Sequence, residues 1–302
     1  MMSEIEIVGV GFCSLDYLSI IPFVPLDGKV EIISDLTQGG GPAATAIVAA
    51  ARLGALTAFI GAVGNDNKGL AILDGLKAEN VNTNYMQIKS GETSPGAFCW
   101  VEKDTGKRSI AWTRGTSMPL DASHIDEKLI ASAKLLHLDG HNTEAAIRAA
   151  LIARENGVLV SLDAGTIVPR IDELVLLSDI CIASEYFALK FTGKSDVKSA
   201  TRCLYDDYGC KVAAVTSGEK GVFAIANQTE VKQEAFKVAV VDTTGAGDVF
   251  HGAFAYAWIQ GWNIKKSLEF ASATAALKCT KFGGRTGIPT IQEVLSFLQT
   301  YK

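Results

Sequence analysis

From about residue 125 onward, short apolar runs alternate with segments of helical length, and this rhythm constrains the fold more than any other feature of the chain. The runs are rich in Val, Ile and Leu, as is typical of strands buried on both faces. Strands that alternate with helices favour a parallel sheet covered by helices on both sides. The sequence predicts strands at 135–138, 159–162, 180–183, 212–216 and 238–241, a hairpin at 222–227 and 230–236, and helices at 143–156, 171–177, 185–191, 195–208, 249–260, 265–280 and 290–300.

The first part of the chain does not show this alternation of strands and helices. Residues 12–38 alternate apolar and polar positions and are interrupted by Pro22 and Pro25, which predicts short antiparallel strands. Residues 96–103 and 107–113 predict a hairpin. We expect these segments to form a small sheet that projects from the main body. The other elements predicted here are strands at 5–11 and 57–63 and helices at 42–53 and 68–79.

The composition excludes several classes of protein. The chain has 302 residues, 48% of them hydrophobic, which indicates a globular protein with a large core. Its net charge of −5 and the lack of a basic stripe argue against a nucleic-acid partner. We find neither a signal peptide in the first residues nor an apolar run long enough to span a membrane, so we expect a cytoplasmic protein without a membrane partner. The six cysteines form no CxxC pair and are interpreted as reduced thiols.

A glycine-rich loop near the C-terminus, Asp-Thr-Thr-Gly-Ala-Gly-Asp, carries groups suited to phosphoryl transfer. Gly245, Ala246 and Gly247 are small, so their backbone N–H groups can converge on an anion. The loop follows the apolar run 236–241, predicted as a strand, and precedes a helix whose N-terminus favours phosphate. Asp248, at the end of the loop, is placed to accept a proton from an attacking hydroxyl.

A second glycine-rich loop lies about 200 residues upstream, at Gly39-Gly40-Gly41-Pro42, and also opens a predicted helix. A single such loop is more often an ordinary turn. Two in one chain indicate phosphate chemistry.

These two loops resemble the signatures of the ribokinase-like (PfkB) carbohydrate kinase family, and the resemblance extends over essentially the whole chain. It implies an α/β fold: a three-layer α/β/α sandwich with a central, mostly parallel sheet and a small β-sheet lid. It also implies one kinase domain over 1–302, with the lid formed by about 12–38 and 96–115. The implied activity is ATP-dependent phosphorylation of a primary hydroxyl of a small sugar, with Mg²⁺.

Within the family, the chain looks closest to ketose kinases. Residues 136–142 are similar to the ketohexokinase segment that borders the sugar, while 39–46, 240–253 and 275–280 resemble 6-deoxy-6-sulfofructose kinases. The expected substrate is therefore fructose or a 6-substituted fructose such as sulfofructose. The Arg expected to grip a sulfonate is absent, and His141 stands in that segment instead.

The resemblance assigns roles to individual residues at matching positions. Asp248 is the implied catalytic base, with Gly245, Ala246 and Gly247 as the anion hole. Two arginines and a histidine are candidates for an anionic group of the substrate. The implied substrate-binding residues are Asp16, Gly40, Gly41 and Asp139, and the implied nucleotide-binding residues are Thr216, Gly218, Thr244, Gly245, Gly247, Lys278, Gly283 and Gly284. The candidates for the anionic group are His141, Arg108 and Arg114, and the two arginines can equally be solvated charges of the predicted hairpin.

Two positions depart from the family pattern. Ala44 stands where the first signature usually has Asn. The Asn-x-x-Glu motif tied to Mg²⁺ is replaced by 184–187, Ser-Glu-Tyr-Phe, which leaves Glu185 as the candidate on the metal side. Some family members bind K⁺ near the second signature, and Asp242 with Thr244 are the candidates for that ion here.

Other functions are less consistent with the sequence. A nucleoside kinase of the same fold would need an apolar pocket beside Asp16, and a sugar-phosphate kinase would need Arg or Lys there. A dehydrogenase is suggested by residues 9–14, which half-match GxGxxG, but the predicted strands that follow do not fit that motif. A non-catalytic binding protein would not need Asp248 together with an intact anion loop.

Two further expectations concern packing. Ile20, Phe23 and Val24 give the lid an apolar edge, so a homodimer through the lid and a monomer are both open. His251 is interpreted as a buried, hydrogen-bonded side chain and Cys279 as a packed thiol.

Overall fold

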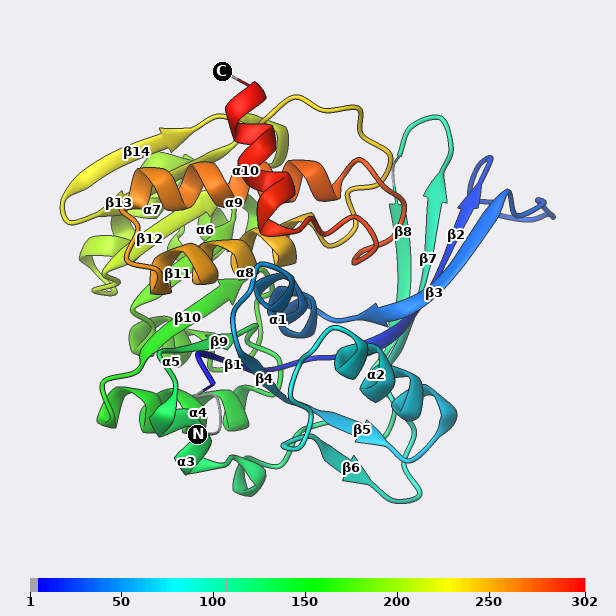
Figure 1. The fold of residues 1–302 in the computed structure, drawn as a ribbon, viewed down its shortest axis with the longest axis horizontal. Coiled ribbons are helices and arrows are strands. Elements are labelled where there is room, and N and C mark those ends of the chain that lie inside the picture. Colours follow the sequence, from blue (N-terminus) through cyan, green and yellow to red (C-terminus); the bar gives the residue numbers. More distant parts are fainter. Residues whose placement is uncertain (1–4, 107, 302) are drawn as a thin grey trace.

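A central sheet of eight strands organises the computed structural model, which describes residues 5–106 and 108–301 (Figure 1). The strands from β12 through to β4 are parallel, as predicted, whereas β13 and β14 add an antiparallel hairpin at one edge. Across the sheet the strands are β14 (Thr229–Gln233), β13 (Val222–Ala226), β12 (Val212–Thr216), β11 (Ile180–Ser184), β10 (Leu159–Ala164), β9 (Leu135–Leu138), β1 (Ile7–Val10) and β4 (Thr57–Ile60).

Helices cover both faces of this sheet, which gives three layers. Successive strand residues point to opposite faces, so Ile7 and Leu135 join one core cluster while Val8 and Leu136 join the other. The first cluster packs against α1 (Pro42–Arg52), α2 (Asn67–Ala78), α8 (Ala246–Ile259), α9 (Ile264–Lys278) and α10 (Ile291–Thr300); the second packs against α3 (Glu127–Ser132), α4 (Thr143–Glu155), α5 (Ile171–Leu177), α6 (Glu185–Thr192) and α7 (Val197–Asp206).

Helices α1 and α8 approach each other closely at Gly252. A Cβ atom at this position would lie 2.0 Å from the carbonyl oxygen of Ala46, so only glycine fits the contact. The two helices that open with the glycine-rich loops are thereby held side by side.

A separate four-stranded sheet projects from the body at the right of Figure 1, in the order β3 (Ser34–Gly40), β2 (Ser14–Ile21), β7 (Gly96–Glu102) and β8 (Arg108–Thr113). Strands β2 and β3 pair antiparallel, and so do β7 and β8, as the sequence predicts. One face of the sheet is buried at Leu18, Cys99 and Val101.

Several sequence predictions of local structure were wrong. Residues 238–241 form no strand, because the N–H of Val241 donates to the Cys279 carbonyl oxygen (2.8 Å) instead of to a neighbouring strand. The predicted strand 57–63 is two strands: β4 pairs with β1, whereas β5 (Ala62–Gly64) pairs with the unpredicted β6 (Gln87–Lys89). Helix α3 and the short 3₁₀ turns Ala122–His124 and Gly218–Lys220 were not predicted.

A few predictions lie outside the described residues. The signal-peptide prediction concerns residues 1–4, and residue 107 was placed at the start of a predicted lid strand. Among the helices of the described residues, none has both the length and the apolar character that crossing a bilayer requires.

Candidate active site

The C-terminal glycine-rich loop forms the N-terminus of α8. Helix α8 begins at Ala246, three residues earlier than predicted, so Asp248 lies in its first turn. Gly245 is the N-cap residue with φ 74°, and a Cβ there would lie 2.8 Å from the carbonyl oxygen of Gly284. Ala246 donates its N–H to the Thr243 carbonyl oxygen at 3.2 Å, which fixes the turn. The loop thus places a helix N-terminus, with its partial positive charge, directly beside a carboxylate.

Asp248 is half-buried and strongly perturbed. Its pKa is raised to about 7, first by burial and then by the negative charge of Asp163, while His251 acts against the rise. A carboxyl with a pKa near neutrality exchanges protons readily at physiological pH, as a general base must.

The upstream glycine-rich loop closes around Asp16 on β2. The Asp16 carboxylate accepts a hydrogen bond from Ser14 Oγ at 2.6 Å, and its pKa is raised by burial. A Cβ at Gly40 would lie 1.9 Å from Asp16 Oδ2, and one at Gly41, whose φ is 93°, would lie 2.3 Å from the Phe12 carbonyl oxygen. These glycines are required by the close approach of β2 and the Phe12 backbone.

Asp139, predicted as a sugar contact, holds three chain segments together. Its carboxylate accepts backbone hydrogen bonds from Phe12 (2.8 Å), Ala43 (3.1 Å) and His141 (3.0 Å). The side chain is 3% exposed, and burial raises its pKa. A carboxylate that accepts three N–H groups has little capacity left for sugar hydroxyls.

His141 lies at an aromatic cluster where the projecting sheet meets the body. Its ring lies 5.3 Å from the ring of Phe12 and 6.3 Å from that of Trp112 on β8. The His141 Nδ1 atom is buried and has no hydrogen-bond partner among the described residues. Arg114 lies over the Trp112 ring at 5.2 Å.

Arg108, the other predicted substrate cation, reaches the segment before the C-terminal glycine-rich loop. It is exposed on β8, and its Nη1 donates to Thr243 Oγ1 at 2.8 Å. This contact joins the projecting sheet to the segment that leads into Gly245–Gly247, so the Arg108 charge lies near that loop.

Outside the C-terminal glycine-rich loop, the predicted nucleotide-binding residues lie on two segments. Thr216, at the end of β12, donates to the Ala183 carbonyl oxygen at 3.3 Å, and Gly218 follows with φ 56° in an exposed turn. Gly283 has φ 103°, and Gly284 packs beside Thr244.

Neither predicted metal site is a preformed cluster of ligands. Within the described ranges, no group of three or more His, Cys, Asp or Glu side chains is arranged to hold a metal ion. Glu185, the first residue of α6, lies 3.8 Å from Lys220. Beside a bound nucleotide, Mg²⁺ commonly takes only one or two protein carboxylates, and phosphate oxygens and water complete its coordination shell. The single carboxylate of Glu185 fits Mg²⁺ held in this way.

The oxygens of Asp242 do not suit the predicted K⁺ site. Asp242 is fully buried, and its carboxylate accepts the N–H groups of Thr244 (2.8 Å) and Gly283 (2.9 Å). Its carbonyl oxygen accepts a hydrogen bond from Lys278 Nζ at 2.8 Å. The three oxygens of Asp242 are therefore already hydrogen-bonded.

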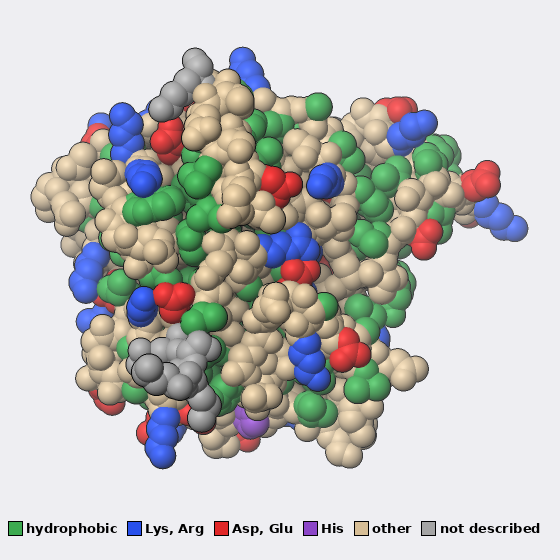
Figure 2. Space-filling model, in the orientation of Figure 1, with side chains coloured by type: hydrophobic (Ala, Val, Ile, Leu, Met, Phe, Trp, Pro, Cys, Tyr) green, Lys and Arg blue, Asp and Glu red, His purple; other side chains and the backbone are tan. Residues whose placement is uncertain are grey.

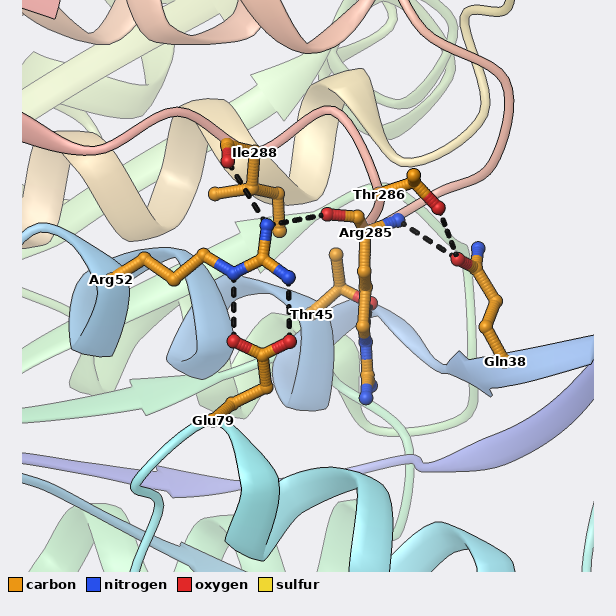
Figure 3. Close-up of polar contacts among 7 residues, drawn as sticks. All are labelled: Gln38, Thr45, Arg52, Glu79, Arg285, Thr286 and Ile288. Carbon is orange, nitrogen blue, oxygen red and sulfur yellow. Dashed lines mark hydrogen bonds and ion pairs between the residues drawn. The ribbon is translucent and has the colours of Figure 1, made fainter. Parts of the chain in front are cut away.

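Arg285, which the sequence reasoning missed, lies buried beside α1 and the upstream glycine-rich loop (Figure 3). Its guanidinium donates to Thr45 Oγ1 (3.1 Å) and to the Gly40 carbonyl oxygen (2.9 Å). Its own carbonyl oxygen accepts from Arg52, which also forms a 2.5 Å ion pair with Glu79 (Figure 3). No sequence pattern distinguishes this arginine from a surface charge, because its partners lie far away in the chain.

An ion pair beneath Asp248 was missed as well. His251, on the next turn of α8, has Nε2 3.2 Å from Asp163 Oδ1. Burial acts to lower the pKa of His251, but Asp163 outweighs it and the pKa is raised. The prediction that His251 is buried and hydrogen-bonded is confirmed. The position of Asp163 at the carboxyl end of a buried strand was the available signal, since ligand sites of parallel sheets gather there.

Two surface hollows lie away from these groups. One lies between α9 and α10 and includes Thr280 and Lys281; the other lies beside α4. Neither is lined by Asp16 or Asp248, so neither hollow coincides with the site.

Comparisons with known proteins agree with this arrangement. A family model described as pfkB family carbohydrate kinase matches residues 16–291. The chain is 34% identical to a ribokinase of Haemophilus influenzae, over 96% of this chain and 97% of the relative, and 27% identical to a 5-dehydro-2-deoxygluconokinase of Clostridium perfringens, over 99% and 94%. These names differ from the ketohexokinase and sulfofructose kinase suggested by short segments.

Solved structures are similar over nearly the whole length. A candidate ribokinase from Agrobacterium tumefaciens has a TM-score of 0.92 at 29% identity and covers 99% of both chains. A ribokinase of Arabidopsis thaliana, solved with ribose and ATP, has a TM-score of 0.86 at 26% identity and covers 98% of this chain and 99% of its own. The three-layer fold with a separate small sheet is therefore that of ribokinases, and the chain belongs to the pfkB family of carbohydrate kinases.

Proposed function

We propose that this protein transfers the γ-phosphoryl group of ATP to a primary hydroxyl of a small sugar, with Asp248 as the general base. The observation that carries the proposal is the position of Asp248 in the first turn of α8, behind the Gly245–Gly247 loop, with a pKa raised to about 7. Relatives named as ribokinase and deoxygluconokinase support the sugar as acceptor.

In this proposal, Asp248 accepts the proton of the sugar hydroxyl as that oxygen attacks phosphorus. The N–H groups at the start of α8 stabilise the negative charge of the transferring group, as does the partial positive charge of the helix end. Arg108, bonded to Thr243, adds a cation on the same side. Mg²⁺, with Glu185 as its one protein ligand, would neutralise phosphate charge when bound.

The sugar is proposed to bind between Asp16 and the aromatic cluster of Phe12, Trp112 and His141. A carboxylate such as that of Asp16 can accept bonds from two neighbouring hydroxyls. The small sheet would act as a lid, because Trp112 on β8 reaches the ring of Phe12 at 5.7 Å. Closure of such a lid excludes water and limits ATP hydrolysis.

A ketose such as fructose, or a 6-substituted fructose, remains our proposed substrate. The unpartnered Nδ1 of His141 and the nearby Arg114 would suit a polar or anionic group at the far end of the sugar. The same observation supports a sugar-phosphate kinase as the second candidate. For a nucleoside kinase, the Phe12 and Trp112 rings would have to receive the base.

The nucleotide is proposed to extend from the α8 N-terminus toward Thr216 and Gly218, with the segment from Lys278 to Gly284 beside the adenine. The second of these segments packs closely against the loop that carries Gly245, because a Cβ on Gly245 would lie 2.8 Å from the Gly284 carbonyl oxygen.

A homodimer through the lid is also proposed. In the small sheet, Phe98 is 55% exposed on the face opposite to the buried Cys99, and Ile110 (49%) and Trp112 (51%) are exposed on β8. Figure 2 shows hydrophobic side chains gathered on the projecting sheet. Exposed apolar strands are commonly covered by a partner. Sedimentation of the free protein as a monomer at micromolar concentration would refute the dimer.

The test of the function is an ATP-coupled screen over fructose, sulfofructose, ribose, fructose phosphates and nucleosides. Asp248→Asn is the blank, and His141→Ala probes the far end of the ligand. We expect one sugar to give turnover that falls at least ~10²-fold in Asp248→Asn. Equal turnover in that variant would refute the role of Asp248.

A further inference from the structure

Lys278, the last residue of α9, is one of the largest fully buried side chains of the protein. Lysine is almost never fully buried unless it is paired. Within the described part of the chain, Lys278 forms no ion pair with a carboxylate, and its Nζ donates to the backbone carbonyl oxygen of Asp242 at 2.8 Å. Burying an ammonium group without a carboxylate partner costs folding free energy, so the burial of Lys278 needs a structural reason.

The surroundings of Lys278 join two loops at the phosphate site. The Asp242 carboxylate binds the N–H groups of Thr244 and Gly283, and the Cys279 carbonyl oxygen accepts the N–H groups of Val241 (2.8 Å) and Asp242 (3.2 Å). The segment before α8 and the segment after α9 are therefore held to each other, with the Lys278 head group at their junction.

The charges that face Lys278 come from several elements. Burial lowers its pKa, and Arg108 on β8 acts in the same direction, whereas Asp242, Cys279 and Asp248 oppose the shift. A positive charge here would lie beside the loop that is proposed to bind the transferring phosphoryl group.

This is also the place where the family resemblance predicted K⁺. Proteins coordinate K⁺ with carbonyl and other oxygens that replace its hydration shell. Here the Asp242 carbonyl oxygen is bonded to Nζ, and both oxygens of the Asp242 carboxylate accept amide N–H groups. The lysine side chain therefore occupies one of the Asp242 oxygens that a monovalent ion would need, and backbone N–H groups occupy the other two.

We propose that the Lys278 ammonium group replaces a monovalent cation at the junction of the two loops, so that the enzyme neither binds nor needs K⁺. The tethered cation holds the Asp242–Thr244 segment and thereby the shape of the anion loop. The phosphorylation measurement that tests this inference rests on the proposed kinase function. The thermal-unfolding measurement does not, because it requires no substrate.

The experiment compares the full-length protein with Lys278→Met and Lys278→Ala in chloride salts of K⁺, Na⁺ and tetramethylammonium at equal ionic strength. Lys278→Met keeps most of the side-chain volume but removes the donor, whereas Lys278→Ala opens space for an ion and water. Lys265→Met, an exposed lysine on the same helix, is the matched control. Thermal unfolding and sugar phosphorylation are measured in each salt.

We expect the Tm and turnover of the wild-type protein and of Lys265→Met to be the same in the three salts. Lys278→Met should lose about 2–4 °C in Tm, because the Asp242 carbonyl oxygen is left without its donor. Its kcat/KM should fall at least about tenfold, since the anion loop loses its support. In Lys278→Ala, K⁺ should restore part of the lost Tm whereas tetramethylammonium should not.

The proposal is overturned if K⁺ raises the Tm or the turnover of the wild-type protein several-fold over tetramethylammonium, or if Lys278→Met retains wild-type Tm and kcat/KM. If Lys278→Ala fails to fold, the salt comparison on the wild-type protein and the Lys278→Met variant still test the proposal. If no sugar is phosphorylated by the wild-type protein, the proposed function fails, and the Tm measurements alone test the role of Lys278.

Discussion

Replacing Asp248 with asparagine should reduce turnover and at the same time stabilise the protein. The pKa of Asp248 rises from 3.8 to about 7 on folding, so between these two values the folded state binds more protons than the unfolded state. Stability then falls as pH rises through this window and stays low above pH 7. Asparagine has no such titration, so Asp248→Asn should gain stability over the wild-type protein as pH increases.

The size of the gain in stability follows from the shift in the pKa of Asp248. A shift of about three pKa units corresponds to an upper limit of about 4 kcal/mol. Asp248 is only half-buried and is screened by solvent, which reduces the expected gain to about 1–2 kcal/mol at pH 8. For a chain of this size that is a rise in Tm of about 2–3 °C.

The assay is thermal unfolding of both proteins from pH 4 to pH 8, alongside turnover with the sugar found in the screen. The difference in Tm should be near zero at pH 4 and grow toward pH 8, while turnover falls at least ~10²-fold. Asp74→Asn, an exposed position on α2, is the control and should give a difference that does not change with pH. A pH-independent difference for Asp248→Asn would refute the reasoning.

Two other substitutions test the surroundings of the site. Asp163→Asn should destabilise the fold by about 3 kcal/mol in urea unfolding, because the buried His251 loses its counter-charge. It should also move the acidic limb of kcat/KM to lower pH, since Asp163 raises the pKa of Asp248; an unmoved limb would contradict that coupling. Gly40→Ala should raise the KM for the sugar more than the KM for ATP, because its Cβ would collide with Asp16, and equal changes would count against Asp16 as the sugar contact.

Local patterns were sufficient for most of the architecture. The alternation of buried strands and helices predicted the parallel sheet, because a strand and a helix each have a period that is visible within a few residues. The small sheet followed from the alternation in 12–38 and 96–103. The wrong strand prediction at 238–241 also came from a local pattern, because an apolar run fits a strand. A strand needs a neighbouring strand to accept its N–H groups, and here the Val241 N–H donates to the Cys279 carbonyl oxygen instead.

The sequence by itself determined the fold class, the two glycine-rich loops and the position of Asp248 behind one of them. Only the tertiary structure decided which charged side chains are buried beside those loops: Arg285 bonds Gly40, 245 residues away, and Lys278 bonds Asp242, 36 residues away. A buried charge and a surface charge look alike in a sequence, because the difference lies in partners from other segments. Such partners come together only when the whole chain packs.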